Sequence, residues 1–204
     1  YEIPEGGKNS KGRAMQNLIN IEQDDKVKAF LVTQDLKDEE YINSHYVIMA
    51  TKKGQVKKTS LEQYSRPRTN GINAITIRED DELLEAKLTT GDSQVMLALK
   101  SGKSIRFEEA KTRPMGRTAS GVRGIKLAHE NDEVIGMVAV NDMESNILVV
   151  SERGYGKRSK LEDYRITNRG GKGVKTLNIS EKTGNLVAIK NVDNSNDLMI
   201  INKS

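Results

Sequence analysis

Basic side chains gather in three stretches of the sequence, and each stretch carries a strong excess of positive charge. Residues 52–68 hold six Lys or Arg against one acid, and residues 100–126 and 153–175 each hold eight against two. The three stretches together carry +17, whereas the whole chain carries +4, so the remainder carries −13. Clustered Lys and Arg neutralise phosphates and release their counterions, which drives binding without base recognition. The sequence therefore predicts a surface that binds a polyanion.

The cations that we expect to contact phosphate all lie in these stretches. They are Lys57, Lys58, Arg66, Arg68, Lys103, Arg106, Arg113, Arg117, Arg123, Lys157, Arg158, Arg165, Arg169 and Lys172. The most distinctive string is Arg169-Gly170-Gly171-Lys172-Gly173, in which the glycines allow a backbone to approach phosphate closely. It lacks the GxxxxGK[ST] spacing of a nucleotide-binding P-loop.

The clustered charge is also compatible with two different roles. Lys and Arg on strands protect sheet edges and solvate the surface, and basic loops on a propeller could bind an acidic protein. Because the excess of positive charge recurs in three stretches at similar spacing, which belong to the internal repeat described below, we favour a continuous basic surface that binds bent duplex DNA. Single-stranded binding relies on aromatic stacking platforms, and the chain has only six Tyr, two Phe and no Trp. We expect Tyr64 and Tyr164, which occupy matching positions, to have structural roles.

No catalytic or metal-binding constellation can be assembled from the sequence. His45 and His129 are the only histidines and have no recurring partner, and the pairs Asp24-Asp25 and Asp80-Asp81 are typical of turns. The absence of Cys excludes disulfides and thiolate metal sites. No run approaches the roughly 18 apolar residues of a membrane span. We therefore expect no enzyme active site and no cofactor within this chain.

The basic stretches belong to an internal repeat. In each unit an apolar run leads to a glycine and then to cations, and a second glycine follows after a basic loop. The first glycines are Gly54, Gly102 and Gly154, which lie 48 and 52 residues apart, and the second glycines are Gly71, Gly121 and Gly173. A further second-type glycine, Gly12, precedes residues 13–21, and a fourth apolar run occupies residues 198–201. Periods of this length indicate a repeat architecture.

Each unit is predicted to hold four short strands, because β-branched runs alternate with Gly and Asx turns. The predicted strands include 47–50, 95–99 and 147–150 before the first glycine, 72–77, 122–127 and 174–179 after the second, and 27–32, 83–88, 134–140 and 186–192 at the end of a unit. About 50 residues and four strands per unit favour an all-β, propeller-like ring over a plain β-sandwich. The acidic segment 33–44 is predicted to be a solvated loop.

The repeat leaves two arrangements open: an open arc of blades, or a ring in which residues 1–45 and 196–204 together form one composite blade. We expect residues 1–45 to end a blade and residues 196–204 to provide the first strand of another. Complete blades are expected at residues 46–93, 94–145 and 146–195. The N-terminus has neither an initiating Met nor a signal-peptide pattern, so we expect the chain to be a fragment.

Three strings give the chain a resemblance to a known family. Gly54-Gln55-Val56-Lys57-Lys58-Thr59, Ser120-Gly121-Val122-Arg123-Gly124-Ile125 and Gly154-Tyr155-Gly156-Lys157-Arg158, in this order, resemble successive blades of the C-terminal domain of bacterial DNA gyrase A. The resemblance implies a six-bladed β-pinwheel that wraps DNA around its rim and so favours negative supercoiling. The related C-terminal domain of topoisomerase IV, with a weaker wrapping role, is the alternative.

The family's QRRGGKG signature is matched only in part, since Thr167 and Asn168 replace its leading Gln-Arg. The resemblance therefore implies only a phosphate-contact role for Arg169 and Lys172. It also implies a cytoplasmic, ATP-dependent type II topoisomerase, an isomerase, as the parent protein. Its catalytic residues, ATP and Mg²⁺ would lie outside this chain. The implied partners are double-stranded DNA, the N-terminal core of gyrase A, and gyrase B in an A2B2 complex.

Overall fold

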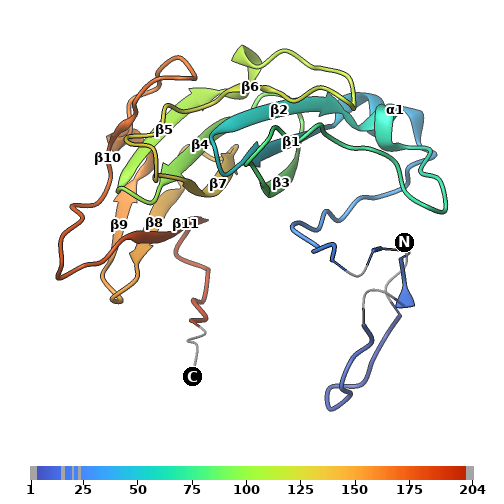
Figure 1. The fold of residues 1–204 in the computed structure, drawn as a ribbon, viewed down its shortest axis with the longest axis horizontal. Coiled ribbons are helices and arrows are strands. Elements are labelled where there is room, and N and C mark those ends of the chain that lie inside the picture. Colours follow the sequence, from blue (N-terminus) through green and yellow to red (C-terminus); the bar gives the residue numbers. More distant parts are fainter. Residues whose placement is uncertain (1–3, 15–16, 20, 23, 201–204) are drawn as a thin grey trace.

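Three antiparallel sheets follow one another along an arc in the part of the chain that the structure describes (Figure 1). The computed structural model describes residues 4–14, 17–19, 21–22 and 24–200. The first sheet has the strand order β3-β1-β2-β6, the second β10-β5-β4-β7, and the third β11-β8-β9. Strands β3, β7 and β11 line the concave side of the arc, and β6 and β10 lie on its convex side (Figure 1).

The bounds of the strands repeat from sheet to sheet. The first sheet contains β1 (Tyr46–Thr51), β2 (Gln55–Ser60), β3 (Leu83–Thr89) and β6 (Val122–Arg123). The second contains β4 (Gln94–Leu99), β5 (Lys103–Glu108), β7 (Val134–Val140) and β10 (Val174–Lys175). The third contains β8 (Asn146–Ser151), β9 (Gly156–Lys160) and β11 (Leu186–Val192). A short 3₁₀ turn follows the second strand of each hairpin, at η2 (Leu61–Tyr64), η3 (Glu109–Lys111) and η4 (Leu161–Asp163).

The hairpin register makes three cations structurally equivalent. The cross-strand pairs are Ile48 with Lys58, Met96 with Arg106, and Leu148 with Arg158. Each cation lies four residues after the first glycine of its repeat. The three repeats therefore share one hairpin geometry, and differences among these cations come from their surroundings.

The second and third repeats each donate one strand, called here the exchanged strand, to the sheet of the repeat before them. The outer strand β6 comes from the second repeat and pairs with β2 of the first, and β10 comes from the third repeat and pairs with β5 of the second. The carbonyl of Gly54 accepts hydrogen bonds from the amides of Gly124 (2.8 Å) and Ile125 (3.3 Å). The carbonyl of Gly102 likewise accepts from the amides of Thr176 (2.9 Å) and Leu177 (3.2 Å). The first glycine of one repeat thus holds the strand that follows the second glycine of the next.

Glycine is required where the exchanged strand begins. Gly121 has φ 87° and Gly173 has φ 71°, in the left-handed region that other residues rarely adopt. A Cβ on Gly121 would lie 2.5 Å from the carbonyl oxygen of Val56, and one on Gly173 would lie 2.4 Å from that of Ser104. The second glycine of the repeat therefore permits both the turn and the close approach to the preceding sheet.

The middle strand β4 is buried on both faces, which explains its uninterrupted apolar run. Val95, Leu97 and Leu99 pack in the core between the first and second sheets, and Met96 and Ala98 pack in the core between the second and third. The periodicity of two puts successive side chains on opposite faces. The predicted strands at 47–50, 95–99 and 147–150 are confirmed as β1, β4 and β8.

The acidic segment before β1 was predicted to be a loop, and this prediction is wrong for its last residues. Residues Glu39–Ser44 form α1, and the Asp38 side chain caps the helix by accepting from the amide of Tyr41 at 3.1 Å. Ile42 is buried and joins a third core cluster with Val47 of β1. The helix forms because it covers the face of the first sheet that no other described sheet covers.

The strands predicted after the second glycines are shorter than expected. Residues 72–77 form no strand, and the runs 122–127 and 174–179 contribute only β6 and β10. After β6 the chain turns inward, because Ile125 is buried in the core and the amide of Lys126 donates to the carbonyl of Gly171 at 2.8 Å. These apolar residues fill the space between sheets instead of extending one.

Two terminal predictions also differ from the structure. Residues 27–32 and 198–200 carry no strand, and the predicted run ends at Ile201, outside the described residues. Ala29 and Leu31 still pack against the third core cluster. The alternation of apolar and polar residues in 27–32 therefore reflects the burial of every second side chain, although this segment forms no strand. Residues 13–21 lie partly outside the described residues.

The strand exchange can be tested by comparing two glycines of similar φ. Gly71 (φ 78°) has open space around its Cβ direction, whereas Gly121 has the Val56 carbonyl in its way. We expect Gly71→Ala to lower the free energy of unfolding by about 1–2 kcal/mol through backbone strain alone. Gly121→Ala should cost distinctly more. Urea unfolding curves measure both changes, and equal losses would contradict the close approach.

Candidate nucleic-acid interface

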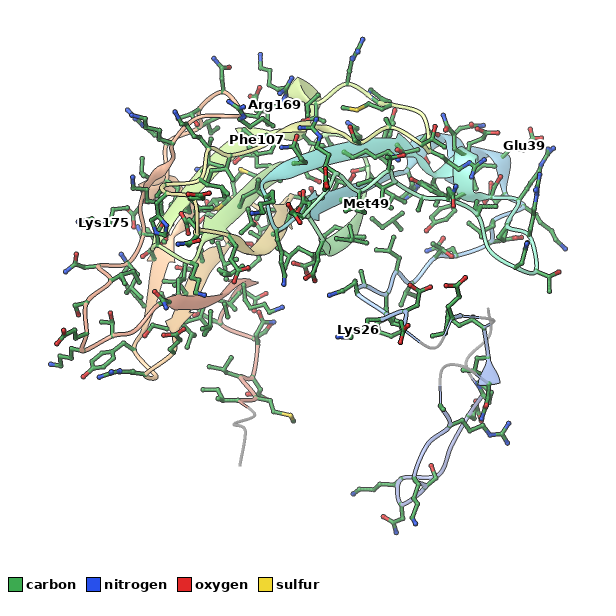
Figure 2. All side chains as sticks on the ribbon, in the orientation of Figure 1. Lys26, Glu39, Met49, Phe107, Arg169 and Lys175 are labelled. Atoms are coloured by element: carbon green, nitrogen blue, oxygen red, sulfur yellow. The ribbon has the colours of Figure 1, made fainter. Side chains whose placement is uncertain are left out.

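Most of the predicted phosphate-binding cations lie in loops and short strands and are exposed or partly exposed. Figure 2 places Arg169 on the convex side and Lys175 at the outer edge, whereas Phe107 lies inside and Lys26 lies within the concave side. We name these exposed or partly exposed cations, together with Lys175, the basic rim. It comprises Arg66, Arg68, Lys103, Arg113, Arg117, Arg123, Lys157, Arg158, Arg165, Arg169, Lys172 and Lys175, all exposed or partly exposed.

The exchanged strands carry one rim cation each. Arg123 of β6 lies opposite Gln55, and Lys175 of β10 lies opposite Lys103. Arg123 and Lys175 each lie two residues after the second glycine of their repeat. Lys175 was not among the predicted site residues, although its matching position in the repeat could have identified it.

Two rim arginines also attach their loops to the preceding repeat. Arg117 donates from Nη1 to the carbonyl of Asn73 (2.9 Å), and Arg169 donates from Nη1 to the carbonyl of Arg123 (3.2 Å). Both arginines lie four residues before a second glycine, and both acceptors lie two residues after the previous one. The same arginine-to-carbonyl hydrogen bond therefore joins successive basic loops, and Arg117 and Arg169 remain partly exposed.

Arginines from two repeats converge where the first two basic loops meet. Arg68, Arg117 and Thr118 line a cleft of about 590 Å³ together with residues 70–73, and Ile19, Ile21 and Asp25 complete its lining. A neighbouring cleft of about 350 Å³ is lined by Arg66, Arg68 and Arg117, with Glu62, Gln63 and Ile72. In both clefts the arginines outnumber the single carboxylate, which favours the contact of an anion across the junction.

The Arg169–Gly173 loop packs closely on the preceding repeat. The amide of Gly170 donates to the carbonyl of Gly124 at 2.6 Å, and the Arg169 Nε donates to the carbonyl of Lys111 at 3.3 Å. Lys172 remains exposed on the loop. The glycines of this string therefore bring one loop against another, and the Gly170 amide is committed to that contact.

Lys58 was predicted to contact phosphate, but the structure buries it. The residue is 4% exposed, and its ammonium lies 3.2 Å from Glu109 Oε1, 3.2 Å from the Gly91 carbonyl oxygen and 4.4 Å from the centre of the Tyr46 ring. Glu109 is fully buried and also accepts from the Thr89 hydroxyl at 2.7 Å. Lys58 thus forms a buried ion pair between the first and second repeats.

Arg106, at the equivalent position of the second repeat, is also buried, at 8% exposed. Its Nη1 donates to the carbonyls of Leu161 (2.7 Å) and Tyr164 (2.8 Å), and its Nε donates to Gln94 Oε1 (2.6 Å). Lys58 and Arg106 therefore both reach the 3₁₀ turn of the following repeat. In the third repeat Arg158 is exposed and donates to Asn194 Oδ1 at 2.7 Å.

Lys57 is the third buried cation among the predicted contacts. Its side chain is 1% exposed, and its ammonium donates to the carbonyl of Ala74 (2.5 Å) and to the carbonyl of Arg117. Burial, and to a lesser degree the nearby charge of Arg117, lowers the pKa of Lys57 from 10.5 to about 8. Lys57, Lys58 and Arg106 are therefore left out of the basic rim, because they are buried.

The two matching tyrosines have structural roles, as predicted. The Tyr64 hydroxyl donates to the carbonyl of Ala74 at 2.9 Å, and the Tyr164 hydroxyl lies 2.5 Å from the Thr176 hydroxyl oxygen. Each tyrosine therefore contacts the residue three positions after the second glycine of its own repeat.

Apart from Lys160–Glu162, which lies beside the rim cations of β9, the described ion pairs lie away from the basic rim. On the inner strand β3 and the turns beside it, Lys28 and Lys52 pair with Glu82, at 2.5 and 3.3 Å, and Lys87 pairs with Glu85 at 2.6 Å. Lys100 pairs with Glu133 at 3.6 Å, and Lys160 pairs with Glu162 at 3.2 Å. Among the ion pairs that the structure describes, none includes a member of the basic rim.

The described residues contain no group of three or more His, Cys, Asp or Glu that could hold a metal ion. None of the helices in the described part of the chain has the length and apolar character needed to cross a lipid bilayer.

Comparison with known proteins points to one family. The family model described as DNA gyrase C-terminal domain, beta-propeller, matches residues 1–34, 45–90, 95–141 and 145–193. The A subunit of DNA gyrase from Staphylococcus epidermidis is 45% identical over 202 residues, and that from Staphylococcus aureus is 44% identical over 202 residues. Each alignment covers 98% of this chain but only 22% of the relative's length.

Solved structures share the same fold. The C-terminal domain of DNA topoisomerase IV aligns with a TM-score of 0.80 at 25% identity, covering 90% of this chain and 56% of that one. The DNA gyrase A C-terminal domain aligns with a TM-score of 0.76 at 24% identity, covering 90% and 59%. The predicted propeller-like, all-β fragment is confirmed by these matches.

The buried ion pair of Lys58 and Glu109 can be tested by measuring the energetic coupling between the two residues. Lys58→Met leaves the Glu109 carboxylate without its cation, so we expect the free energy of unfolding to fall by about 3–5 kcal/mol. The double variant Lys58→Met/Glu109→Gln should lose less than the sum of the two single losses. Urea titrations of all four proteins give this coupling, and strictly additive losses would show that the two groups do not interact.

The lowered pKa of Lys57 predicts how stability depends on pH. Between about pH 8 and 10.5 the unfolded chain binds more protons at Lys57 than the native chain does. The free energy of unfolding of the native sequence should therefore rise with pH in this window, relative to Lys57→Met. Urea unfolding of both proteins from pH 7 to 10.5 isolates this difference, and parallel curves would contradict the lowered pKa.

Proposed function

Because the chain belongs to the DNA gyrase C-terminal domain family, we propose that it binds duplex DNA along the basic rim without reading base sequence. The observation that carries this proposal is the separation of charge. Rim cations such as Arg113, Arg123 and Lys172 are exposed, and none is in a described ion pair. Lys87 of the concave strand β3, by contrast, is paired with Glu85.

Phosphate contact fits the rim better than base recognition. A helix or a two-stranded ribbon normally enters the major groove to read bases. The only α-helix in the described residues, α1, has six residues and packs on the first sheet. The rim instead offers flexible Lys and Arg on loops and on the two-residue strands β6 and β10. Such contacts fix the position of a duplex without carrying sequence information.

The duplex is favoured over a single strand because the rim has few stacking platforms. Single-strand binders stack bases on exposed aromatic rings. Tyr64 and Tyr164 are committed to their own repeats through their hydroxyl groups. Tyr155 is the only exposed large aromatic residue among the described residues of the three repeats.

The arc of repeats supports bending of the bound duplex. Equivalent cations recur on the convex side from sheet to sheet, so a duplex that follows them curves around the domain (Figure 1). We infer that this bending, or wrapping, serves the negative supercoiling reaction of a gyrase. The identity to the A subunit of gyrase favours this role over that of a topoisomerase IV domain.

The proposed function is that of a non-catalytic part of a larger enzyme. The chain corresponds to 22% of the length of its curated relatives. We place the strand-passage chemistry and its use of ATP and Mg²⁺ in other parts of the parent protein or in gyrase B. The A2B2 assembly and the cytoplasm are the setting that this role implies.

Two triple variants with the same charge change test the rim. Arg113→Gln/Arg123→Gln/Lys172→Gln removes three rim cations that lie outside the described ion pairs, and Lys28→Gln/Lys87→Gln/Lys100→Gln removes three ion-paired cations. If each rim cation meets one phosphate, the slope of log K against log salt should fall by about 0.9 per cation, hence by up to about 3, in the rim variant. The control should keep a slope close to that of the native sequence.

Fluorescence anisotropy with a labelled duplex measures both slopes. Equal losses in the two variants would mean that binding follows net charge and not the rim. No DNA binding by the native chain at low salt would instead favour an acidic protein as the partner.

A further inference from the structure

Lys57 lies beneath the junction of the first two basic loops. Its ammonium donates to the carbonyl of Ala74 in the first repeat and to that of Arg117 in the second, and the side chain is buried. We propose that Lys57 is a positioning residue of the basic rim, which orders the loop that carries Arg113 and Arg117 without touching DNA. This inference rests on the proposed function and adds to it a residue that acts from inside the fold.

The two loops meet along a short series of hydrogen bonds. The Thr76 hydroxyl donates to the Thr118 carbonyl at 2.6 Å, and the Thr76 amide donates to the Ala119 carbonyl at 3.4 Å. The Arg117 amide donates to Gln63 Oε1 at 3.0 Å. Lys57 binds the same two segments from the interior of the protein. Its buried ammonium therefore adds an interior contact to the hydrogen bonds made by Thr76 and Arg117.

The geometry explains why a cation suits this position. Two carbonyl oxygens, those of Ala74 and Arg117, point inward to the ammonium, and no described carboxylate pairs with it. The groups facing Lys57 are these carbonyls, the Tyr64 hydroxyl on the Ala74 oxygen and the charge of Arg117. With its carbonyl bound inside, the loop presents its basic side chains outward.

A buried lysine at this position occurs in the first repeat and in neither of the other two. The equivalent position, three residues after the first glycine, is Ile105 in the second repeat and Lys157 in the third. Ile105 is buried beside Gly171, so the second loop closes through glycine and apolar contact. Lys157 is exposed, and no described loop of a following repeat covers it. A lysine here is therefore buried where the next basic loop lies over it.

A double-mutant cycle distinguishes positioning from direct contact. Lys57→Met keeps the length and apolar stem but removes the donor to both carbonyls. We expect it to lower the affinity of the chain for a duplex of about 40 base pairs and to reduce the salt slope by about 1–2, corresponding to one or two lost phosphates. In the background Arg113→Gln/Arg117→Gln, the same change should have no further effect on affinity or slope.

Each outcome of the cycle decides one question. An unchanged affinity in Lys57→Met, or an equal loss in both backgrounds, would overturn the positioning role. If Arg113→Gln/Arg117→Gln itself binds DNA like the native chain, the proposed use of this loop fails, and that result is separate from any effect of Lys57.

Two further variants protect the test from a simple loss of stability. Ile147→Ala removes a core side chain between the second and third sheets, in a cluster that contains no residue of the first two basic loops. It should lower the unfolding midpoint but leave the salt slope unchanged. If Lys57→Met does not fold, Tyr64→Phe removes the other donor to the Ala74 carbonyl while keeping the ring. It should reduce the slope in the same direction by a smaller amount, and an unchanged slope would contradict the proposal.

Discussion

The contact between the first glycine of one repeat and the exchanged strand of the next is the constraint on which the structure depends. The carbonyl of Gly54 binds the amides of Gly124 and Ile125, and Gly102 repeats this arrangement one unit later. Gly121 provides the turn and the close approach that let the strand reach β2. Because the first two sheets are each completed by a strand of the following repeat, these units depend on one another, and contacts between neighbours fix the arc.

The same exchange separates the cations into two classes. It carries Arg123 onto the outer edge of the preceding sheet, where the side chain is exposed, and it places a loop or turn of the next repeat over Lys57, Lys58 and Arg106. The buried cations bind carbonyls or a carboxylate, which compensates their desolvation. The exposed cations remain available for phosphate. Buried cations in this sequence therefore stabilise the contacts between repeats, and exposed cations form the basic rim.

Much of the fold could be predicted from the sequence, because its signals are local. The apolar runs 47–50, 95–99 and 147–150 predicted strands β1, β4 and β8, of which β1 and β4 are buried on both faces, and the spacing of the glycines predicted the repeat. The sequence could not show which repeat each strand pairs with, so 122–127 was predicted as a long strand although only β6 forms. For the same reason Lys58 and Arg106 were predicted at the surface. Their burial comes from Glu109 and Leu161, which lie about 50 residues away and belong to the next repeat.

The central claim is that the convex side binds duplex DNA through several phosphates and little else. The most direct measurement is a salt titration of the native chain with two unrelated duplexes of about 40 base pairs. We predict a linear fall of log K with log salt, with the same slope for both sequences and a magnitude that corresponds to several phosphates at about 0.9 each. A slope near zero, or affinities that depend strongly on sequence, would contradict the claim.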